Sequence, residues 1–306
     1  MQALPTVKQL RHLIALAEHG HFGRAAHACH VTQSTLSASI KEIEDILRAA
    51  LVDRTKRRVV MTPLGHATVA RARRVIEALE ALAQAAASGR EPLSGLIRLG
   101  VIPTIGPFVL PRLLPKLRKL HPRLRLELVE DTTERLVPDL HAGKLDAVLL
   151  ALPSALGNVE RALLFDDRFH VALPPGHALA GYEALSPAEI RAESMLLLRD
   201  GHCLRDHALA ACRVGRGRPL AALEATSLYT LIQMVDNGFG ITLVPELAVA
   251  AGILRGTGIA VRPLDAPAAA RKVALVWRKG TGRREEFKLL AERIRTMIRP
   301  TAVGRS

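Results

Sequence analysis

The sequence predicts an α/β protein in three parts: a small N-terminal domain of helices and a β-hairpin, a long linking helix, and a C-terminal domain of two α/β lobes. Three observations support this prediction. Helical apolar repeats run to about residue 47, residues 66–87 are rich in alanine, arginine, glutamate and leucine, and from residue 93 apolar strands alternate with helical segments. We therefore divide the chain at 1–65, 66–92 and 93–306, with lobe I at about 93–164 and 268–306 and lobe II at about 165–267.

The N-terminal domain is expected to contain three helices. Residues 6–30 hold two of them, separated by Gly20, and the third begins at the N-cap Thr32 and ends near Leu47. Apolar residues of the third helix recur at spacings of four, three and four, and they form one stripe that faces a core: Leu36, Ile40, Ile43 and Leu47.

The opposite side of this third helix is polar: it carries Gln33, Ser34, Ser37 and Lys41. Such side chains can reach base edges and phosphates in a major groove, although the same pattern alone is equally typical of a solvated helix face. The next segment favours the DNA interpretation, because residues 51–63 are predicted to form two short strands around a basic tip. That tip can bind a phosphate backbone through Arg54, Lys56, Arg57 and Arg58.

The charge of the chain also favours a polyanionic partner. It holds 43 Lys and Arg against 29 Asp and Glu, a formal net charge of +14, and each neutralised phosphate releases counterions. No signal peptide and no membrane-spanning apolar run are visible. We therefore expect a cytoplasmic protein with no membrane partner, whose three cysteines are kept reduced by default.

Residues 93–306 are expected to form a mostly parallel sheet covered by helices on both faces. Strands are predicted at 96–101, 125–130, 147–152, 169–173, 195–198, 241–244 and 273–277, and helices at 111–120, 133–141, 229–237 and 285–298. The last strand and helix are predicted to return to lobe I, which leaves a cleft between the two lobes.

Residues 6–65 resemble the DNA-binding domain of LysR-type transcriptional regulators. The motifs that carry the resemblance are Phe22-Gly23-Arg24-Ala25-Ala26, Val31-Thr32-Gln33-Ser34-Thr35-Leu36-Ser37, Arg54-Thr55 and Thr62-Pro63-Leu64-Gly65. The resemblance implies a winged helix-turn-helix, a dimerising linker helix and a two-lobed, periplasmic-binding-protein-like regulatory domain. One departure is visible, since Arg48 stands where the family usually has glycine.

The same resemblance implies the partners. Double-stranded operator DNA would be contacted by Gln33, Ser34, Ser37, Lys41, Arg54, Arg57 and Arg58. A homodimer is expected because the groove-reading helix must meet two half-sites, and the family implies a homotetramer on DNA and a contact with RNA polymerase.

A second set of residues resembles the peroxide-responsive members of that family. It comprises Asp200-Gly201-His202-Cys203-Leu204-Arg205-Asp206 with Cys212, Ile102-Pro103-Thr104-Ile105-Gly106-Pro107, and Gly240-Ile241-Thr242-Leu243-Val244-Pro245. The resemblance implies that Cys203 reacts with hydrogen peroxide and then forms a disulfide with Cys212. It also implies a peroxide pocket, with Arg205 beside the sulfur, made of Thr104, Thr133, His202, Arg205 and Asp206. His207 replaces the glutamine that is common after the aspartate.

This chemistry explains why those residue types are needed. A peroxide is attacked by thiolate, so we expect a lowered pKa for Cys203, at the N-terminus of a helix and near a cation. If residues 203–212 are helical, the Cα atoms of the two cysteines lie roughly 13 Å apart. Since a disulfide needs them within ~7 Å, we expect local unfolding before the bond can form.

Other interpretations of these residues stay open. Cys203, His207 and Cys212 could hold zinc, or the cysteines could be inert. Thr104 could cap a helix or contact a small effector in the cleft. Three functions follow from these alternatives: a peroxide-sensing regulator, a regulator that binds a metabolite, and a thiol peroxidase. The groove-reading helix favours a regulator that is no enzyme and needs no cofactor.

The N-terminal domain also holds a cysteine and several histidines. Cys29 is expected to be a buried structural thiol, because it lies near apolar residues. No metal site is expected there, since scattered imidazoles beside a basic domain are typically exposed: His19, His21, His27 and His30.

Overall fold

The computed structural model describes residues 4–55, 58–86, 92–152, 156–212, 224–267 and 269–298. The chain divides into two compact units, one made of Met1–Arg90 with His141–Lys144 and the other of Glu91–Leu140 with Leu145–Ser306. Each unit folds around its own set of buried apolar side chains.

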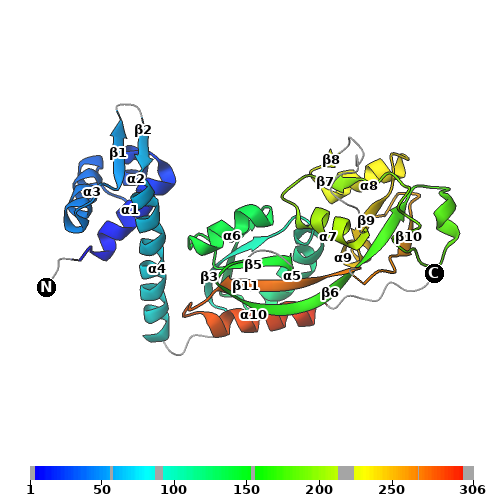
Figure 1. Cartoon of the computed structure of the whole chain (residues 1–306). Helices are drawn as coiled ribbons and strands as arrows, with labels where there is room; N and C mark the ends of the chain where they lie inside the picture. Colours follow the sequence, from blue (N-terminus) through cyan, green and yellow to red (C-terminus); the bar gives the residue numbers. More distant parts are fainter. Residues whose placement is uncertain are drawn as a thin grey trace. The chain divides into compact units, whose positions relative to one another are not determined.

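The first unit is helical with one hairpin (Figure 1). In chain order it contains α1 (Val7–His19), α2 (Phe22–Ala28), α3 (Gln33–Leu47), β1 (Val52–Thr55), β2 (Arg58–Met61) and α4 (Pro63–Ala86). Thr6 and Gln9 form a capping box at the start of α1, and Gly20 follows its end in the left-handed conformation, at φ +58°. The predicted helices and hairpin are confirmed, although the linking helix begins at Pro63 rather than at residue 66.

The three small helices pack around side chains that are fully excluded from solvent: Leu13, Leu16, Ala25, Leu36, Ile40, Ile43 and Leu51. Three of them belong to the apolar stripe that was predicted for the third helix. The fourth member of that stripe, Leu47, is 40% exposed because α3 ends there.

Arg48 makes the turn after α3. Its backbone lies in the left-handed region, at φ 51° and ψ 42°, and its N–H approaches the carbonyls of Glu44 and Asp45. Glycine adopts this conformation freely, whereas a residue with a Cβ atom pays about 1–2 kcal/mol. The turn that the family resemblance predicts is therefore present, with an arginine in the glycine conformation.

The second unit is built on a sheet with the strand order β10-β6-β11-β5-β3-β4, in which β9 also pairs with β6. The strands of this sheet are β3 (Gly95–Val101), β4 (Leu124–Glu130), β5 (Ala147–Leu152), β6 (Val159–Leu173), β9 (Thr242–Pro245), β10 (Ala260–Pro263) and β11 (Ala270–Arg278). Only β3, β4 and β5 pair in parallel among the described strands of this sheet. The sheet is therefore mixed, not mostly parallel as the sequence suggested.

Helices and short strands complete the second unit. They are α5 (Gly106–Leu120), α6 (Thr133–His141), η1 (Ala178–Gly181), β7 (Leu197–Leu198), α7 (Cys203–Cys212), β8 (Glu224–Ala225), α8 (Leu228–Asp236), α9 (Glu246–Ala250) and α10 (Arg284–Met297). The helix predicted at 111–120 begins earlier, at Gly106, because a proline in the first turn needs no N–H partner and the helix continues through Pro111 and Pro115. Within the described ranges, no helix is long and apolar enough to cross a membrane.

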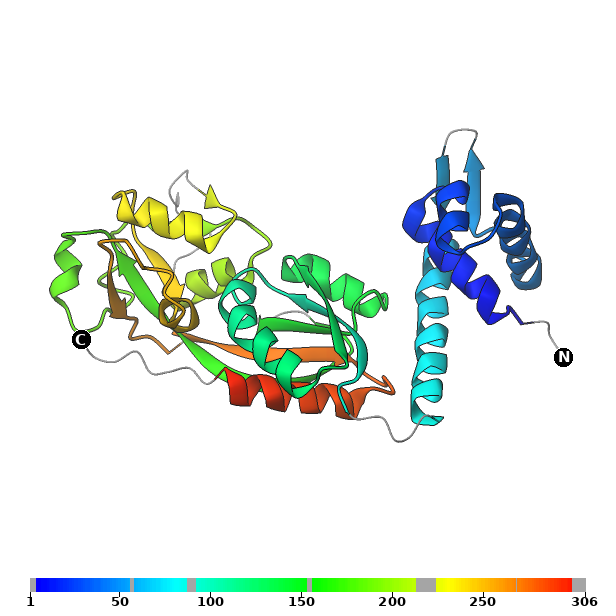
Figure 2. The same ribbon diagram turned by 180° about the vertical axis from the view of Figure 1, so that it is seen from behind.

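Strands β6 and β11 pair with each other along the whole of β11. The strand predicted at 169–173 is only the end of β6, which begins at Val159. The charged run Asp166-Asp167-Arg168 hides this continuity from a pattern-based prediction. The first part of β6 pairs with β11, and its last residues pair with β9 and β10. Figure 2 shows α10 lying along β6 and β11, next to α5.

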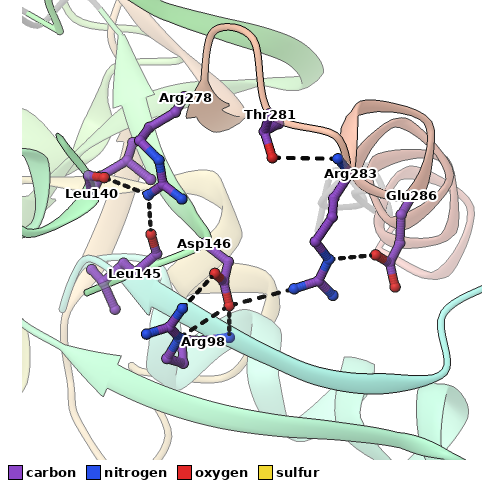
Figure 3. Close-up of polar contacts among 8 residues, drawn as sticks. All are labelled: Arg98, Leu140, Leu145, Asp146, Arg278, Thr281, Arg283 and Glu286. Carbon is purple, nitrogen blue, oxygen red and sulfur yellow. Dashed lines mark hydrogen bonds and ion pairs between the residues drawn. The ribbon is translucent and has the colours of Figure 1, made fainter. Parts of the chain in front are cut away.

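A polar network holds the start of β5 against its neighbours (Figure 3). The buried Asp146 carboxylate accepts hydrogen bonds from the Arg98 backbone N–H at 2.7 Å and from the Arg98 side chain, and it lies 3.7 Å from Arg283 Nη1. Arg278 Nη1 donates to the carbonyls of Leu140 and Leu145, each at 2.6 Å. The network joins β3, β5, β11 and α10.

Candidate functional site

The polar side of α3 is exposed as predicted. Gln33, Ser34 and Lys41 are exposed and Ser37 is half-buried, while the apolar stripe on the other side lies in the core. Thr32 caps the helix: its hydroxyl accepts from the Thr35 N–H at 3.2 Å. The helix can therefore present these four side chains to a groove without losing its packing.

Specific polar contacts hold α3 in place. His12 Nδ1 on α1 is hydrogen-bonded to Ser39 Oγ at 2.8 Å, with both side chains buried. Burial lowers the pKa of His12, and Lys8 adds to this effect. Glu44 Oε1 accepts from the N–H groups of Leu51 and Val52 at 2.7 and 3.0 Å, so the end of α3 is fixed to the start of the hairpin.

The basic hairpin forms where it was predicted. The strands pair from Val52↔Met61 at the base to Thr55↔Arg58 at the tip. Arg54 lies on β1 and Arg58 begins β2, whereas Arg57 and Lys56 lie outside the described residues.

The other side chains singled out in this unit need one correction. Cys29 is half-buried, not buried, and it is a free thiol whose pKa is raised by burial and by Glu18. His21, His27 and His30 are exposed and His19 is half-buried. Across the part of the chain that the structure describes, no group of three or more His, Cys, Asp or Glu side chains could hold a metal ion.

Cys203 and Cys212 are the first and last residues of α7. The helix expected over 203–212 is therefore present, and nine helical steps separate the two Cα atoms by roughly 13 Å. Cys203 carries a free thiol that keeps some solvent exposure. The side chain of Cys212 lies outside the description.

Five influences act on the thiol of Cys203. Burial is the largest and raises its pKa; the Arg271 guanidinium and the Thr133 hydroxyl lower it, Asp206 raises it, and the Ala151 backbone lowers it. The pKa of Cys203 lies above its ordinary value as a result. The expectation of a lowered pKa is wrong for this conformation, because one cation and a helix N-terminus do not outweigh desolvation.

Arg271 is the cation at this site, and it is held from two sides. Its Nε donates to Asp167 Oδ2 at 3.0 Å and its Nη2 lies 2.9 Å from the same oxygen. Its Nη1 donates to Thr104 Oγ1 at 2.8 Å, and its Nη2 donates to the Thr104 carbonyl at 3.0 Å. Asp167 Oδ1 also accepts from the Leu247 N–H at 2.9 Å. All three polar side chains are at most 2% exposed.

The two threonines of the expected peroxide pocket have hydroxyls that can act on a ligand. Thr104 Oγ1 accepts from Arg271, so its own proton is available for donation. Thr133 Oγ1 is buried, and within the described chain it has no oxygen or nitrogen partner. Besides its effect on the Cys203 thiol, this hydroxyl could bind an oxygen of a ligand.

The remaining pocket residues lie at the start of α7. His202 is half-buried, and burial lowers its pKa against the opposing effect of Asp131. Asp206 is exposed. Arg205 was expected beside the sulfur, and this stays a prediction. Its Nε pairs with Asp200 at 2.9 Å and its Nη1 donates to the Leu198 carbonyl at 3.1 Å.

His207 packs in the interior next to this site. It is 8% exposed, its ring lies 6.2 Å from that of Phe169, and its Nε2 donates to the Leu152 carbonyl at 3.0 Å. Burial lowers its pKa, and the Arg271 charge adds to that effect. The Nε2 proton is used in this bond, so only Nδ1 of the ring could bind a metal ion.

Sequence reasoning missed Arg271 and Asp167. A signal was present, because charged residues at 166–168 and 271–272 interrupt segments that otherwise read as apolar strands. Opposite charges inside strands of one domain indicate a buried pair. The sequence does not say which acidic residue faces which basic one.

The chain is similar in sequence to known proteins over nearly its whole length. Residues 7–66 match the family described as "Bacterial regulatory helix-turn-helix protein, lysR family", and residues 90–299 match "LysR substrate binding domain". The chain is 40% identical over 292 residues to "DNA-binding transcriptional dual regulator OxyR" of Escherichia coli, covering 95% of each protein. It is 39% identical over 289 residues to "Hydrogen peroxide-inducible genes activator" of Dickeya chrysanthemi, covering 94% of each.

Solved structures are similar over nearly the whole chain. A full-length OxyR cysteine variant from Pseudomonas aeruginosa has a TM-score of 0.83 and 36% identity, covering 97% of this chain and all of that one. A hydrogen-peroxide-bound OxyR cysteine mutant from Corynebacterium glutamicum has a TM-score of 0.65 and 32% identity, covering 97% of this chain and 94% of that one.

Proposed function

Because the chain belongs to the LysR family of bacterial helix-turn-helix regulators, we propose that it is a DNA-binding transcription regulator that senses hydrogen peroxide and controls oxidative-stress genes. Cys203 is the thiol that reacts, and Cys212 is its disulfide partner. The observation that carries the proposal is the setting of Cys203, a free thiol on which the Arg271 cation and the buried Thr133 hydroxyl both act. The names of the relatives, which describe peroxide-inducible gene activation, support it.

DNA is bound by residues 1–65. Gln33, Ser34 and Ser37 contact base edges, and Lys41 and the hairpin arginines Arg54, Arg57 and Arg58 contact phosphates. Residues 66–92 join two copies of the chain into a dimer, so that their two DNA-binding domains contact two operator half-sites. Residues 93–306 sense the oxidant. Binding to operator DNA places the protein in the cytoplasm, where the oligomer is a dimer or tetramer in contact with RNA polymerase.

The first chemical step is oxidation of Cys203 by two electrons. Its thiolate attacks one oxygen of hydrogen peroxide, the O–O bond breaks, and the other oxygen leaves as hydroxide and takes a proton to become water. A hydrogen bond from the Thr104 hydroxyl can hold the leaving oxygen, and Arg271 stabilises the negative charge that passes through the site. The product on the protein is a sulfenic acid.

The second step joins the two cysteines. The Cys212 sulfur attacks the sulfenic sulfur of Cys203, the S–S bond forms, the S–O bond breaks, and water leaves. A separation of roughly 13 Å between the Cα atoms exceeds the ~7 Å limit for a disulfide, so α7 must unwind first. The bond therefore selects a second conformation of lobe II, and this change is the signal to the DNA-binding domains.

We infer a sensor and not an enzyme. One peroxide consumes one pair of thiols, and the chain carries a groove-reading helix that catalysis does not need. Turnover of peroxide with a thiol donor far above stoichiometric amounts would contradict this part of the proposal.

The test compares the reduced full chain with variants Cys203→Ser, Cys212→Ser and, as a matched control, Cys29→Ser. Each is exposed to stoichiometric hydrogen peroxide, then analysed by non-reducing peptide mass spectrometry and by footprinting on its operator. We expect an intrachain bond between Cys203 and Cys212 and a changed footprint in the wild type and in Cys29→Ser, and neither in the other two. Identical footprints before and after oxidation would refute the proposal.

A further inference from the structure

We propose that Asp167 is a positioning residue of the thiol site: its buried carboxylate fixes the Arg271 guanidinium beside Cys203 and offsets part of its charge. The inference rests on the proposed role of Cys203 as the reacting thiol. Asp167 lies outside the expected peroxide pocket, on β6, whereas Arg271 lies on β11.

The geometry comes from two paired strands. Arg271 on β11 lies opposite Asp167 on β6 in the strand register, so their side chains meet without any loop between them. The contacts of 3.0 and 2.9 Å to a single carboxylate oxygen define the direction of the guanidinium. Both side chains are at most 2% exposed, so neither charge is screened by water.

Asp167 is itself fixed. Its second oxygen accepts the Leu247 N–H at 2.9 Å, at the start of α9, so the carboxylate cannot rotate without leaving a buried donor unpaired. Thr104 holds the far side of Arg271 through two hydrogen bonds. In Asp167→Asn the amide oxygen can still accept from Arg271, so the guanidinium keeps its place while the counter-charge is lost.

Two opposite effects follow from this arrangement. The fixed position of Arg271 favours the Cys203 thiolate, while the negative charge of Asp167 reduces the net positive charge that the thiol experiences. The other charged group acting on the thiol is Asp206 on its own helix; His207, also on α7, is neutral near pH 7 because burial lowers its pKa. Asp167 thus weakens the lowering effect of Arg271 on the pKa of Cys203, which burial already raises.

The experiment measures the rate of iodoacetamide alkylation of Cys203 against pH, by peptide mass spectrometry on the reduced full chain. In Asp167→Asn we expect the profile to move to lower pH by about one unit, because Arg271 loses its counter-charge and stays bound to Thr104. In Arg271→Lys we expect a move to higher pH, because lysine keeps the charge but cannot hold both Asp167 and Thr104. Asp166→Asn is the matched control: the same change at an exposed neighbour, with no expected shift.

An unchanged or upward-shifted profile in Asp167→Asn would overturn the proposal, and so would a wild-type profile in Arg271→Lys. If Asp167→Asn does not fold, Asp167→Ser, a smaller uncharged substitution, gives the same test. Since alkylation requires no peroxide, the outcome is independent of the experiment on peroxide sensing, and either proposal can fail while the other stands.

Discussion

Helices α3 and α7 each carry the residues through which the protein is proposed to act, but they are held in different ways. The inner face of α3 is apolar, and its polar ties to α1 and to the hairpin are satisfied. Helix α7 carries a buried histidine, and its neighbours include a buried arginine and a buried hydroxyl without an oxygen or nitrogen partner among the described residues. The difference indicates that α3 keeps one conformation, whereas α7 is able to unwind.

The largest expected effect is at the buried pair of the second unit. Arg271→Met leaves the Asp167 carboxylate without a counter-charge in the interior, which costs about 3–5 kcal/mol of unfolding free energy. Denaturant unfolding followed by the fluorescence of Trp277, in the same unit, measures this loss. Lys272→Met, at the exposed neighbouring position, is the control and should unfold almost as the wild type. Equal midpoints for the two variants would show that the pair is not a determinant of stability.

A smaller loss is expected in the core beneath α3. Ile40→Ala removes buried methyl groups at a position with no solvent exposure and costs about 2–5 kcal/mol in the first unit. Ser34→Ala, on the exposed side of the same helix, should leave stability within ~0.5 kcal/mol and weaken operator binding. Circular dichroism melts and operator titrations of the two variants separate packing from DNA contact. If Ser34→Ala melts like Ile40→Ala, the assignment of the two faces is wrong.

Arg48→Gly should stabilise the first unit. Glycine occupies the left-handed conformation at φ 51° without strain, although it adds backbone entropy to the unfolded chain, so the net gain is about 1 kcal/mol. The matched control is Arg24→Gly on α2, within a regular helix, where glycine should destabilise. A lower melting temperature for Arg48→Gly would mean that the arginine side chain makes a compensating contact.

The smallest expected effect is the pH dependence of the stability of the first unit. Burial lowers the pKa of His12 below its ordinary value of 6.5, so the unfolded chain binds this proton more readily than the folded one. The stability from the neutral imidazole is fully present above pH 6.5 and declines as the pH falls from 6.5 through the lowered folded value. Melts of the wild type and of His12→Gln should therefore diverge at neutral pH and converge in acid. If the melting temperatures of the two proteins kept a constant difference over that pH range, the pKa of His12 would not be lowered by folding.

Much of the first unit could be predicted from local sequence. Thr32 as a cap, the stripe of Leu36, Ile40 and Ile43, and the basic hairpin all appear in the structure as expected. For the thiol site, the motif identified Cys203 and the helix that begins there. It did not identify Arg271, the cation whose charge lowers the pKa of the thiol, because this arginine belongs to a strand far along the chain.

The sequence by itself determined most of the helices, which face of α3 is buried, and that two cysteines lie at opposite ends of one helix. These features depend on residues within a few positions of one another, where periodicity and capping act. Only the tertiary structure decided the charge balance around Cys203, because Arg271 meets Asp167 and Thr104 across separations of 104 and 167 residues. Contacts at such distances follow from strand pairing and burial, and no local pattern in the chain encodes which partners meet.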